Sequence, residues 1–339
     1  MQAQTRQHPQ QQSRTLNETL LLRRYGGPVS HALLNPPYQR FRLPHVEGFL
    51  GYAVHGKTAV VLGDPIATDA NKPHFVEAFL EFTRQKRWRT IYAVTSERMG
   101  EYVEPQGGAL MQFAELLITN PQEKLYLKIK GNRLKGKSNV ARNSGVSVRE
   151  YCPDLALERD GFESSAIRVI QRWQSARKGF QLFLEAPQLF EHQMGCRWFI
   201  AEHEGEPIGL LYLLKIGDFG CEYAIDLVFS APEAPNFTNE LMILTAMDVL
   251  GSEGVTRLSL AVGPSRTLGD IRGLGPLSRR LAHFFYNTAN FLVPQYGKQF
   301  FWEQFGVIER KPLFLYFDSP RIGLWAFWAL LKTFNFSKT

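Results

Sequence analysis

The stretch GFLGYAVHGKTAVVLG, residues 48–63, decides the expected fold. It predicts two β-strands joined by a tight turn at His55-Gly56-Lys57, and Asp64-Pro65 ends the second strand because Pro has no N–H to donate. Residues 73–86 follow with apolar side chains at nearly helical spacing, and residues 90–95 predict a third strand. Ser96 is expected to cap the short helix that comes next.

The same order of elements is expected a second time further along the chain. Residues 197–202 and 208–216 predict two strands joined by a turn, and a helix at residues 239–251 precedes a strand at residues 257–262. The repeated order predicts an α/β fold with two related halves. We expect a disordered tail at residues 1–15 and an N-terminal half at residues 16–155. A C-terminal half at residues 156–318 and an apolar tail helix at residues 319–339 should follow.

A concentrated basic segment lies between the two predicted halves. KLYLKIKGNRLKGKSNVARNSGVSVR, residues 124–149, contains eight Lys or Arg residues and no Asp or Glu. Such a run repels itself unless water or an anionic partner balances it. The segment therefore indicates a phosphate-rich partner, although a solvated charged helix ended by Gly145 would look the same. The cations that could contact phosphates are Lys130, Arg133, Lys135, Lys137 and Arg142.

The composition narrows the class of protein further. The 339 residues carry a net charge of +7, and 44 % of them are hydrophobic, which allows a packed core. Cys152, Cys196 and Cys221 lie far apart, and this spacing favours reduced thiols in a cytoplasmic protein. No Cys or His spacing predicts a metal site. The polar, Gln-rich start is unlike a signal peptide, and no apolar run is long enough to span a membrane.

The last residues of the sequence are unusually aromatic. IGLWAFWALLKTFNF, residues 322–336, contains one charged residue and is too short to cross a bilayer. One interpretation is a helix docked on the core. The other is an interfacial anchor that lies against lipid, where Trp, Phe and Lys are all favoured.

Several short motifs, taken in order, resemble those of a known family. Gly63-Asp64-Pro65 follows an apolar strand, Lys86-Arg87-Trp88 ends a helix, and LKGKSNVARN at residues 134–143 is a basic motif. Asp226-Leu227 then ends a strand, and Glu240 opens a helix. Over residues 48–317 the set is similar to the C-terminal catalytic domain of bacterial phosphatidylglycerol lysyltransferases and alanyl-phosphatidylglycerol synthases.

The resemblance implies both a fold and an activity. The fold would be two tandem acetyltransferase-like (GNAT-like) halves, with mixed, mostly antiparallel sheets flanked by helices. The activity would move an aminoacyl group from aminoacyl-tRNA to a hydroxyl of a membrane lipid such as phosphatidylglycerol. Because the donor ester is already activated, no cofactor is expected. Family members usually carry an N-terminal transmembrane region that this sequence lacks, so a cytoplasmic protein bound peripherally to the anionic inner membrane face is implied.

Three side chains become catalytic candidates through the resemblance. Asp226, in the apolar strand AIDLVF, could hold the donor's ammonium group, accept the hydroxyl proton, or simply bond to nearby backbone amides. Glu240 could lie near the active cleft or only complement the helix dipole, and Asn239 beside it is a secondary candidate. Lys298, in YGKQFFWEQF, could pair with a lipid phosphate or the tRNA 3′ end, or be a surface lysine.

This sequence departs from the family pattern in two places. The strand of Asp226 usually continues to an Arg, whereas here it continues through Val228 to Phe229. The late basic-aromatic motif usually has lysines near the positions of Trp302 and Gln304. Either the acceptor differs, or Lys298 or Arg266 supplies the missing positive charge.

Two other functions stay open from the sequence alone. An acyl-CoA-dependent N-acyltransferase would need a glycine-rich loop that cradles pyrophosphate at a helix N-terminus, and Arg272-Gly273-Leu274-Gly275 lacks the spacing. A non-catalytic protein that binds RNA or a membrane through its basic segment would account for the missing Arg after Asp226.

Overall fold

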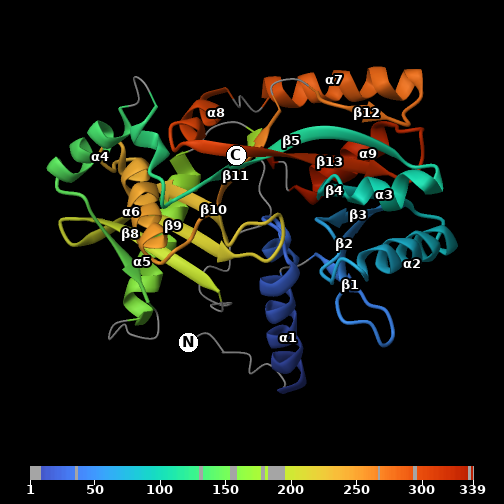
Figure 1. Cartoon of the computed structure of the whole chain (residues 1–339), viewed down its shortest axis with the longest axis horizontal. Coiled ribbons are helices and arrows are strands. Elements are labelled where there is room, and N and C mark those ends of the chain that lie inside the picture. The colour runs from blue at the N-terminus through green and yellow to red at the C-terminus, as the bar shows by residue number, and fades with distance from the viewer. Residues whose placement is uncertain are drawn as a thin grey trace.

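One twelve-stranded mixed sheet forms the framework of the protein, with helices on both faces (Figure 1). The computed structural model describes residues 9–34, 37–129, 133–152, 159–176, 180–181, 195–265, 268–292, 296–334 and 337–338. The strands are β1 (Gln39–Phe41), β2 (Leu50–His55), β3 (Thr58–Leu62), β4 (Arg89–Thr95), β5 (Ala109–Thr119), β6 (Ser147–Tyr151), β7 (Phe180–Gln181), β8 (Cys196–His203), β9 (Glu206–Lys215), β10 (Tyr223–Ser230), β11 (Leu258–Pro264), β12 (Ile271–Arg272), β13 (Val307–Phe317) and β14 (Ser337–Lys338). The helices are α1 (Pro9–Tyr25), α2 (Lys72–Gln85), α3 (Met99–Val103), α4 (Leu134–Asn143), α5 (Arg159–Ala176), α6 (Thr238–Ser252), α7 (Pro276–Leu292), α8 (Tyr296–Glu303) and α9 (Leu324–Thr333), with short 3₁₀ turns η1 (Ser30–Leu34), η2 (Glu104–Gln106) and η3 (Leu125–Leu127).

The predicted repeat of hairpin, helix and strand is present in both halves of the sheet. β2 and β3 form an antiparallel hairpin, and α2 then crosses over to β4, which pairs in parallel with β3. In the second half β9 pairs antiparallel with β8 and β10, and α6 crosses over to β11, which pairs in parallel with β10. The expected mixed, mostly antiparallel α/β fold is therefore confirmed.

The two halves share one continuous sheet. The main path runs β1-β2-β3-β4-β13-β5-β11-β10-β9-β8-β6, with β12 beside β5 and a separate small sheet of β7 and β14. β13 comes late in the chain but lies between β4 and β5 of the first half. β5 continues the path by pairing antiparallel with β11 of the second half. Backbone hydrogen bonds thus connect the halves at the middle of the sheet.

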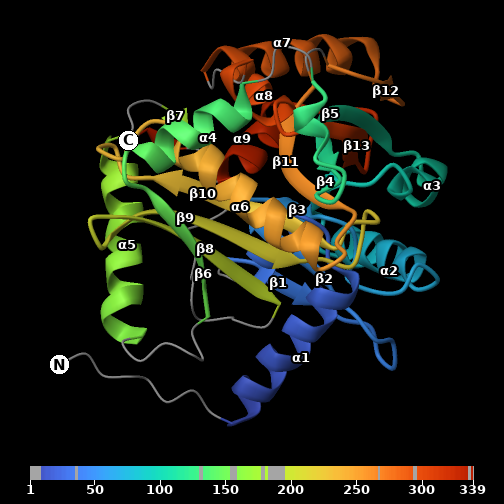
Figure 2. The ribbon, with the colours of Figure 1, turned by 60° about the vertical axis from the view of Figure 1, so that its left-hand side comes forward.

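The side chains of the sheet alternate between two faces, as strand geometry requires. On β9, Tyr212 and Leu214 belong to one core cluster with Val169 of α5, whereas Leu211 and Leu213 belong to another with Met242 of α6. We call these the α5 face and the α6 face. Core contacts place α1, α5, α7 and α9 on the α5 face, and α4, α6 and α8 on the α6 face; Figure 2 shows α4 beside α6.

The expected cap at Ser96 is wrong. Arg98 occupies the N-cap position of α3 and makes no side-chain cap bond. The backbone N–H of Ser96 donates to Asp64 Oδ1 at 2.9 Å, and its hydroxyl donates to Asp64 Oδ2 at 2.6 Å. Asp64 is 7 % exposed, and a buried carboxylate requires donors more strongly than a helix end that reaches water does.

Helix α1 is attached at its C-terminal end to the loop between β9 and β10. It begins at Pro9, within the expected tail at 1–15, and the first eight residues lie outside the described part. The carbonyl of Gly26 accepts hydrogen bonds from the N–H groups of Gly217 and Asp218, both at 3.1 Å. A Cβ on Gly217 would lie 1.9 Å from the carbonyl oxygen of Arg24, so this approach requires glycine.

The aromatic end of the chain forms the short helix α9. Its buried side, Ala326, Ala329 and Leu330, packs in the core of the α5 face, so the docked interpretation holds for that side. No helix among the described residues has the length and apolar character that crossing a membrane requires.

Candidate functional site

The basic segment forms helix α4, as expected, and places one lysine against the start of α6. Lys137 Nζ donates to Gln304 Oε1 at 2.8 Å and lies 3.6 Å from Glu240 Oε1. The ammonium group also lies 5.6 Å from the ring centroid of Phe237, the residue that precedes α6. Glu240 is buried. The structure therefore brings together one candidate tRNA contact, Lys137, and one candidate catalytic residue, Glu240.

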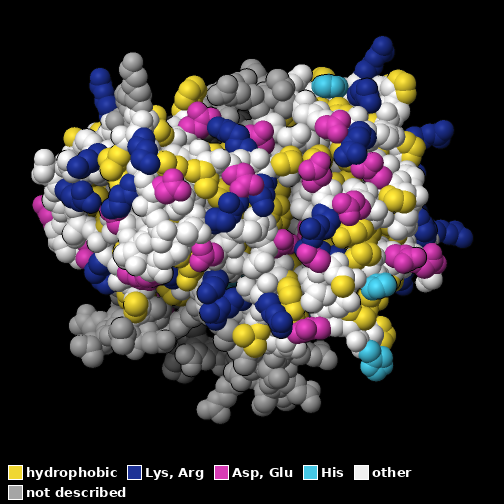
Figure 3. Space-filling view, viewed as in Figure 1, with side chains coloured by type: hydrophobic (Ala, Val, Ile, Leu, Met, Phe, Trp, Pro, Cys, Tyr) yellow, Lys and Arg dark blue, Asp and Glu magenta, His cyan; other side chains and the backbone are white. Residues whose placement is uncertain are grey.

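The other cations of α4 point to solvent. Arg133, Lys135 and Arg142 are exposed, and no ion pair to them occurs among the described residues. Figure 3 shows Lys and Arg side chains gathered over the α4 end of the molecule, at the left, while blue and magenta intermix elsewhere on that face. Lys130 lies outside the described residues. The exposed cations form a surface that an anionic ligand could reach without rearrangement.

Asp226 lies at an irregularity of β10, where the register with β9 shifts between Ile225 and Leu227. Its side chain reaches solvent, yet burial by the surrounding protein raises its pKa to about 7. Surrounding protein atoms therefore desolvate the carboxyl group although part of the side chain reaches solvent. Such a group is half ionised near neutral pH, which is the property of a general base.

A thiol and a phenol lie near Asp226 on the α5 face. Cys196 Sγ and Tyr212 Oη are 2.9 Å apart across neighbouring strands. Burial, the hydrogen bond to Tyr212 and the charge of Asp226 act on the Cys196 thiol, and their net effect raises its pKa to about 12. Burial first, then Cys196 and Asp226, raise the pKa of Tyr212 as well. Both groups therefore remain protonated at neutral pH and can donate hydrogen bonds.

Next to Asp226 the sheet is incompletely paired. Within the described residues, β10 and β11 pair only at Tyr223–Leu258 and Ala224–Ser259, although both strands continue beyond these positions. β11 itself shifts register against β5 between Ser259 and Ala261. Beyond Ala224, the edge of β10 that faces β11 has no ladder partner among the described residues, and this opening lies next to Asp226.

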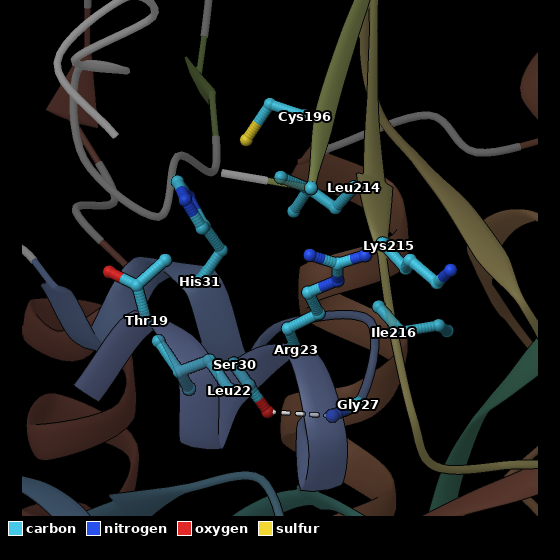
Figure 4. Close-up of a pocket in the computed structure, with 11 residues that line it drawn as sticks. Thr19, Leu22, Arg23, Gly27, Ser30, His31, Cys196, Leu214, Lys215 and Ile216 are labelled. Carbon is cyan, nitrogen blue, oxygen red and sulfur yellow. Dashed lines mark hydrogen bonds between the residues drawn. The ribbon is translucent and has the colours of Figure 1, made fainter. Parts of the chain in front are cut away.

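A pocket that the sequence did not reveal lies beside this group of side chains. It encloses about 320 Å³, including its open mouth, between α1, η1 and the start of β8 and end of β9. Figure 4 shows Cys196 of β8 and His31 of η1 facing one another across it, with Arg23 of α1 reaching toward β9. Arg23 and Lys215 are exposed cations at this pocket. The alternation of side chains between the two faces of β8 and β9 could have indicated that Cys196 faces the core. No local sequence pattern predicts that α1 lies beside these strands.

The structure does not bring all the site residues predicted from the sequence into one place. Asp226 acts on the α5 face, whereas Lys137 and Glu240 lie on the α6 face. Lys298 lies in α8, which packs against β11, and its side chain is outside the described residues, as is Arg266. Asn239 lies beside Glu240, and its Oδ1 atom is buried without a hydrogen bond.

The two departures from the family pattern have structural consequences. Phe229, at the position expected to hold Arg, packs its ring 5.5 Å from that of Trp173 of α5. Gln304 accepts the hydrogen bond of Lys137, and Trp302 packs on the core of the α6 face.

Within the described residues, no group of three His, Cys, Asp or Glu side chains could hold a metal ion.

A second charged cluster connects the halves away from Asp226. Lys72, in the first turn of α2, is 4 % exposed and donates to Asp218 Oδ2 at 2.9 Å. It also lies 3.0 Å from Asp69 Oδ1. Burial and the nearby charge of Asp218 raise the pKa of Asp64 to about 6. The cluster joins α2 of the first half to the β9–β10 loop of the second.

Comparison with known proteins places the chain in a family. Residues 18–295 match the family model described as phosphatidylglycerol lysyltransferase, C-terminal. Because this match covers most of the sequence, the chain belongs to that family.

Individual relatives agree with this assignment. The chain is 27 % identical over 248 residues to the lysylphosphatidylglycerol biosynthesis bifunctional protein LysX of Rhodococcus opacus, covering 70 % of this chain and 21 % of that protein. It is 25 % identical over 241 residues to the protein of the same name from Mycobacterium tuberculosis, covering 67 % and 20 %. The chain thus spans about a fifth of the length of the curated relatives it matches.

A solved structure shows the same fold. L-PGS from Bacillus licheniformis superposes with a TM-score of 0.77 at 18 % identity, covering 94 % of this chain and 95 % of that chain. At this level of identity the likeness concerns the fold alone.

Proposed function

We propose that this protein transfers an aminoacyl group from aminoacyl-tRNA to a hydroxyl of an anionic glycerophospholipid, with phosphatidylglycerol as the reference acceptor. The observation that carries the proposal is the family match over residues 18–295. The desolvated carboxyl group of Asp226 supports it, because the reaction needs one proton acceptor and no activation of the donor.

The proposed reaction is an ester exchange. The lipid hydroxyl oxygen attacks the carbonyl carbon of the aminoacyl ester, and Asp226 accepts the hydroxyl proton. The bond from the carbonyl carbon to the ribose oxygen then breaks, and the proton passes from Asp226 to that oxygen as the tRNA leaves. The oxyanion that forms in between would accept hydrogen bonds from N–H groups of β10 where β11 no longer pairs with it.

We further propose that the two substrates approach from opposite faces of the sheet. The cations of α4 lie on the α6 face and would contact tRNA phosphates without reading sequence. The lipid would approach from the α5 face, where Asp226 and the pocket lie. The exposed cation Arg23 would face the lipid phosphate and take the place of the Arg that this sequence lacks after Asp226.

The remaining candidates receive supporting roles in this proposal. Glu240 is buried beside Lys137 and would hold that ammonium group in position, or bind the ammonium group of the donor amino acid. The buried Oδ1 of Asn239 would accept a hydrogen bond from the same donor group. Lys298 would pair with the phosphates of the tRNA 3′ end.

The proposed activity is tested by incubating the protein with a set of tRNAs that carry radiolabelled amino acids, together with a total lipid extract. We expect label in the organic phase for at least one amino acid. The matched control is the Asp226→Asn protein under the same conditions. If no charged tRNA delivers label to lipid, the transferase proposal is wrong.

The exposed cations of α4 give a separate prediction. Replacing both Lys135 and Arg142 by Glu should weaken binding of every tRNA by about tenfold or more, because two phosphate contacts are lost. The slope of the logarithm of affinity against the logarithm of salt concentration should fall by about 2. Filter binding at several salt concentrations measures both quantities. Lys137 is left intact because its partner Glu240 is buried.

A matched control for this variant exists in the other half of the molecule. Lys86 and Arg87 are exposed at the C-terminal end of α2, and replacing both by Glu makes the same change in net charge. This variant should bind tRNA nearly as the unchanged protein does. Equal loss of binding in both variants would mean that only net charge matters and that α4 is not the tRNA surface.

A further inference from the structure

Helix α9 exposes a continuous apolar stripe. Leu324, Trp328 and Leu331 are 69 %, 49 % and 40 % exposed. Their spacing of four and three residues places them on one side of the helix, opposite the buried Ala326 and Ala329. One apolar side of α9 packs on the core, and the other apolar side is exposed and available to a binding partner.

Helix α7 extends the stripe. Leu277 and Phe284 are 79 % and 63 % exposed, and their seven-residue spacing places them on one side of this helix as well. The ring centroid of Phe284 lies 5.5 Å from that of Phe285, which stacks on Phe327 of α9 at 3.5 Å. The rings therefore connect the two helices. We call Leu277, Phe284, Leu324, Trp328 and Leu331 the α7–α9 patch.

The Lys and Arg side chains of α7 and α9 have no acidic residue beside them on the same helix. Four cations on or beside these helices are exposed, and none of them forms an ion pair among the described residues: Arg279, Arg280, Arg321 and Lys332. Arginines elsewhere on the protein, such as Arg197 and Arg257, are paired with glutamates. The unpaired cations favour an anionic partner.

We propose that the α7–α9 patch is the surface by which the protein docks on an anionic phospholipid bilayer. Large apolar and aromatic side chains enter the boundary between headgroups and acyl chains, and the surrounding Arg and Lys residues contact lipid phosphates. A second copy of the chain fits less well, because joining two such patches would bring like charges together. The inference deepens the proposed function and rests on it for the choice of lipid.

The position of the patch agrees with the site. α7 and α9 pack on the α5 face of the shared sheet, which is also the face of Tyr212, Cys196 and Asp226. The cations of α4 lie on the other face. Docking through the patch would turn the acceptor side toward the lipid and leave α4 accessible to tRNA from the aqueous side.

Vesicle binding tests the proposal. The probe is a set of vesicles of phosphatidylcholine with and without phosphatidylglycerol, separated by sedimentation. Replacing both Phe284 and Trp328 by Ser should reduce partitioning onto phosphatidylglycerol vesicles by about tenfold or more, because the apolar anchors are lost. Replacing both Arg280 and Lys332 by Gln should remove most of the preference for phosphatidylglycerol.

The control variant replaces Leu127 and Val140 by Ser. These side chains are 54 % and 48 % exposed and belong to η3 and α4, on the other face. It should bind vesicles as the unchanged protein does. Absence of vesicle binding by the unchanged protein, or equal binding by the patch and control variants, would overturn the docking proposal. The proposal would also be overturned if sedimentation velocity showed a dimer of the unchanged protein and a monomer of the patch variant.

Transfer assays separate this inference from the proposed function. The patch variant should keep its transfer rate with phosphatidylglycerol dispersed in detergent micelles and lose it with vesicles. If the unchanged protein binds vesicles in the expected way but transfers nothing in either system, the proposed activity is wrong and docking stands. If transfer to vesicles is the same in the patch variant, docking through α7 and α9 is wrong and the activity stands.

Discussion

Replacing Asp226 by Asn is expected to reduce aminoacyl transfer by about 100-fold or more, since the amide cannot accept the hydroxyl proton. The measurement is the initial rate of labelled lipid formation at saturating charged tRNA. The replacement keeps the size and shape of the side chain, so binding of tRNA should not change. The control is Asp248→Asn, an exposed aspartate of α6 that pairs with Lys124.

The pH dependence of transfer follows from the pKa of Asp226. Burial raises this pKa to about 7, so the base is ionised above neutral pH and progressively lost below it. The ratio kcat/KM should be constant above about pH 8 and fall about tenfold per pH unit well below pH 7. The residual rate of Asp226→Asn should lack this dependence. Transfer that is independent of pH between 6 and 8 in the unchanged protein would remove Asp226 from the role of base.

The stability of the same variant separates a catalytic role from a structural one. The pKa of Asp226 in the folded protein is above the ordinary value near 4, so its ionised form lowers stability progressively between about pH 4 and pH 7. The neutral amide has no such cost. Asp226→Asn should therefore be at least as stable as the unchanged protein at pH 8, measured by thermal unfolding. A large loss of stability would indicate a structural carboxylate bonded to its surroundings.

The second large effect is expected from Lys72→Met. Lys72 is 4 % exposed and is the cation that Asp218 and Asp64 share between the two halves. Methionine fills the same space without the charge and leaves these carboxylates unbalanced. Removing one partner of a buried ion pair costs several kcal/mol, and because Asp218 is partly exposed we expect a loss of about 2–4 kcal/mol in the free energy of unfolding.

Urea unfolding at two pH values tests the cause of that loss. The pKa of Asp64 is raised to about 6, chiefly by burial and then by Asp218, and Lys72 opposes this rise. Without Lys72 the pKa should be higher still, so Asp64 is neutral at pH 5 and the loss should be smaller there than at pH 7.5. Lys86→Met, at an exposed lysine, should change stability by less than about 0.5 kcal/mol at both pH values. Equal stability of Lys72→Met and the unchanged protein at pH 7.5 would contradict the argument.

The local patterns of the sequence predict most of the sheet but not its assembly. The hairpin of β2 and β3 and the crossover helices α2 and α6 follow from turn residues and apolar spacing that lie next to one another in the chain. The place of β13 between β4 and β5 has no such signal, because pairing over that sequence distance is decided by the whole core.

The site shows the same limit. An ionisable residue in the apolar strand AIDLVF is visible in the sequence, and so Asp226 could be proposed as the base. Its neighbours Tyr212 and Cys196 lie on other strands, and their hydrogen bond depends on the register between β8 and β9. A run of cations also looks uniform in sequence, although Lys137 is held by Gln304 and Glu240 while Lys135 is exposed.

The central place of β13 affects the order in which the protein can mature on the ribosome. Strands β1 to β5 are synthesised early, but β4 and β5 each keep an open edge until residues 307–317 emerge. Unpaired strand edges attract other chains, so the early part is exposed to wrong pairing during most of translation. The strand that closes this opening also precedes α9 in the chain, so the side that we propose to face lipid forms only after β13 has been synthesised.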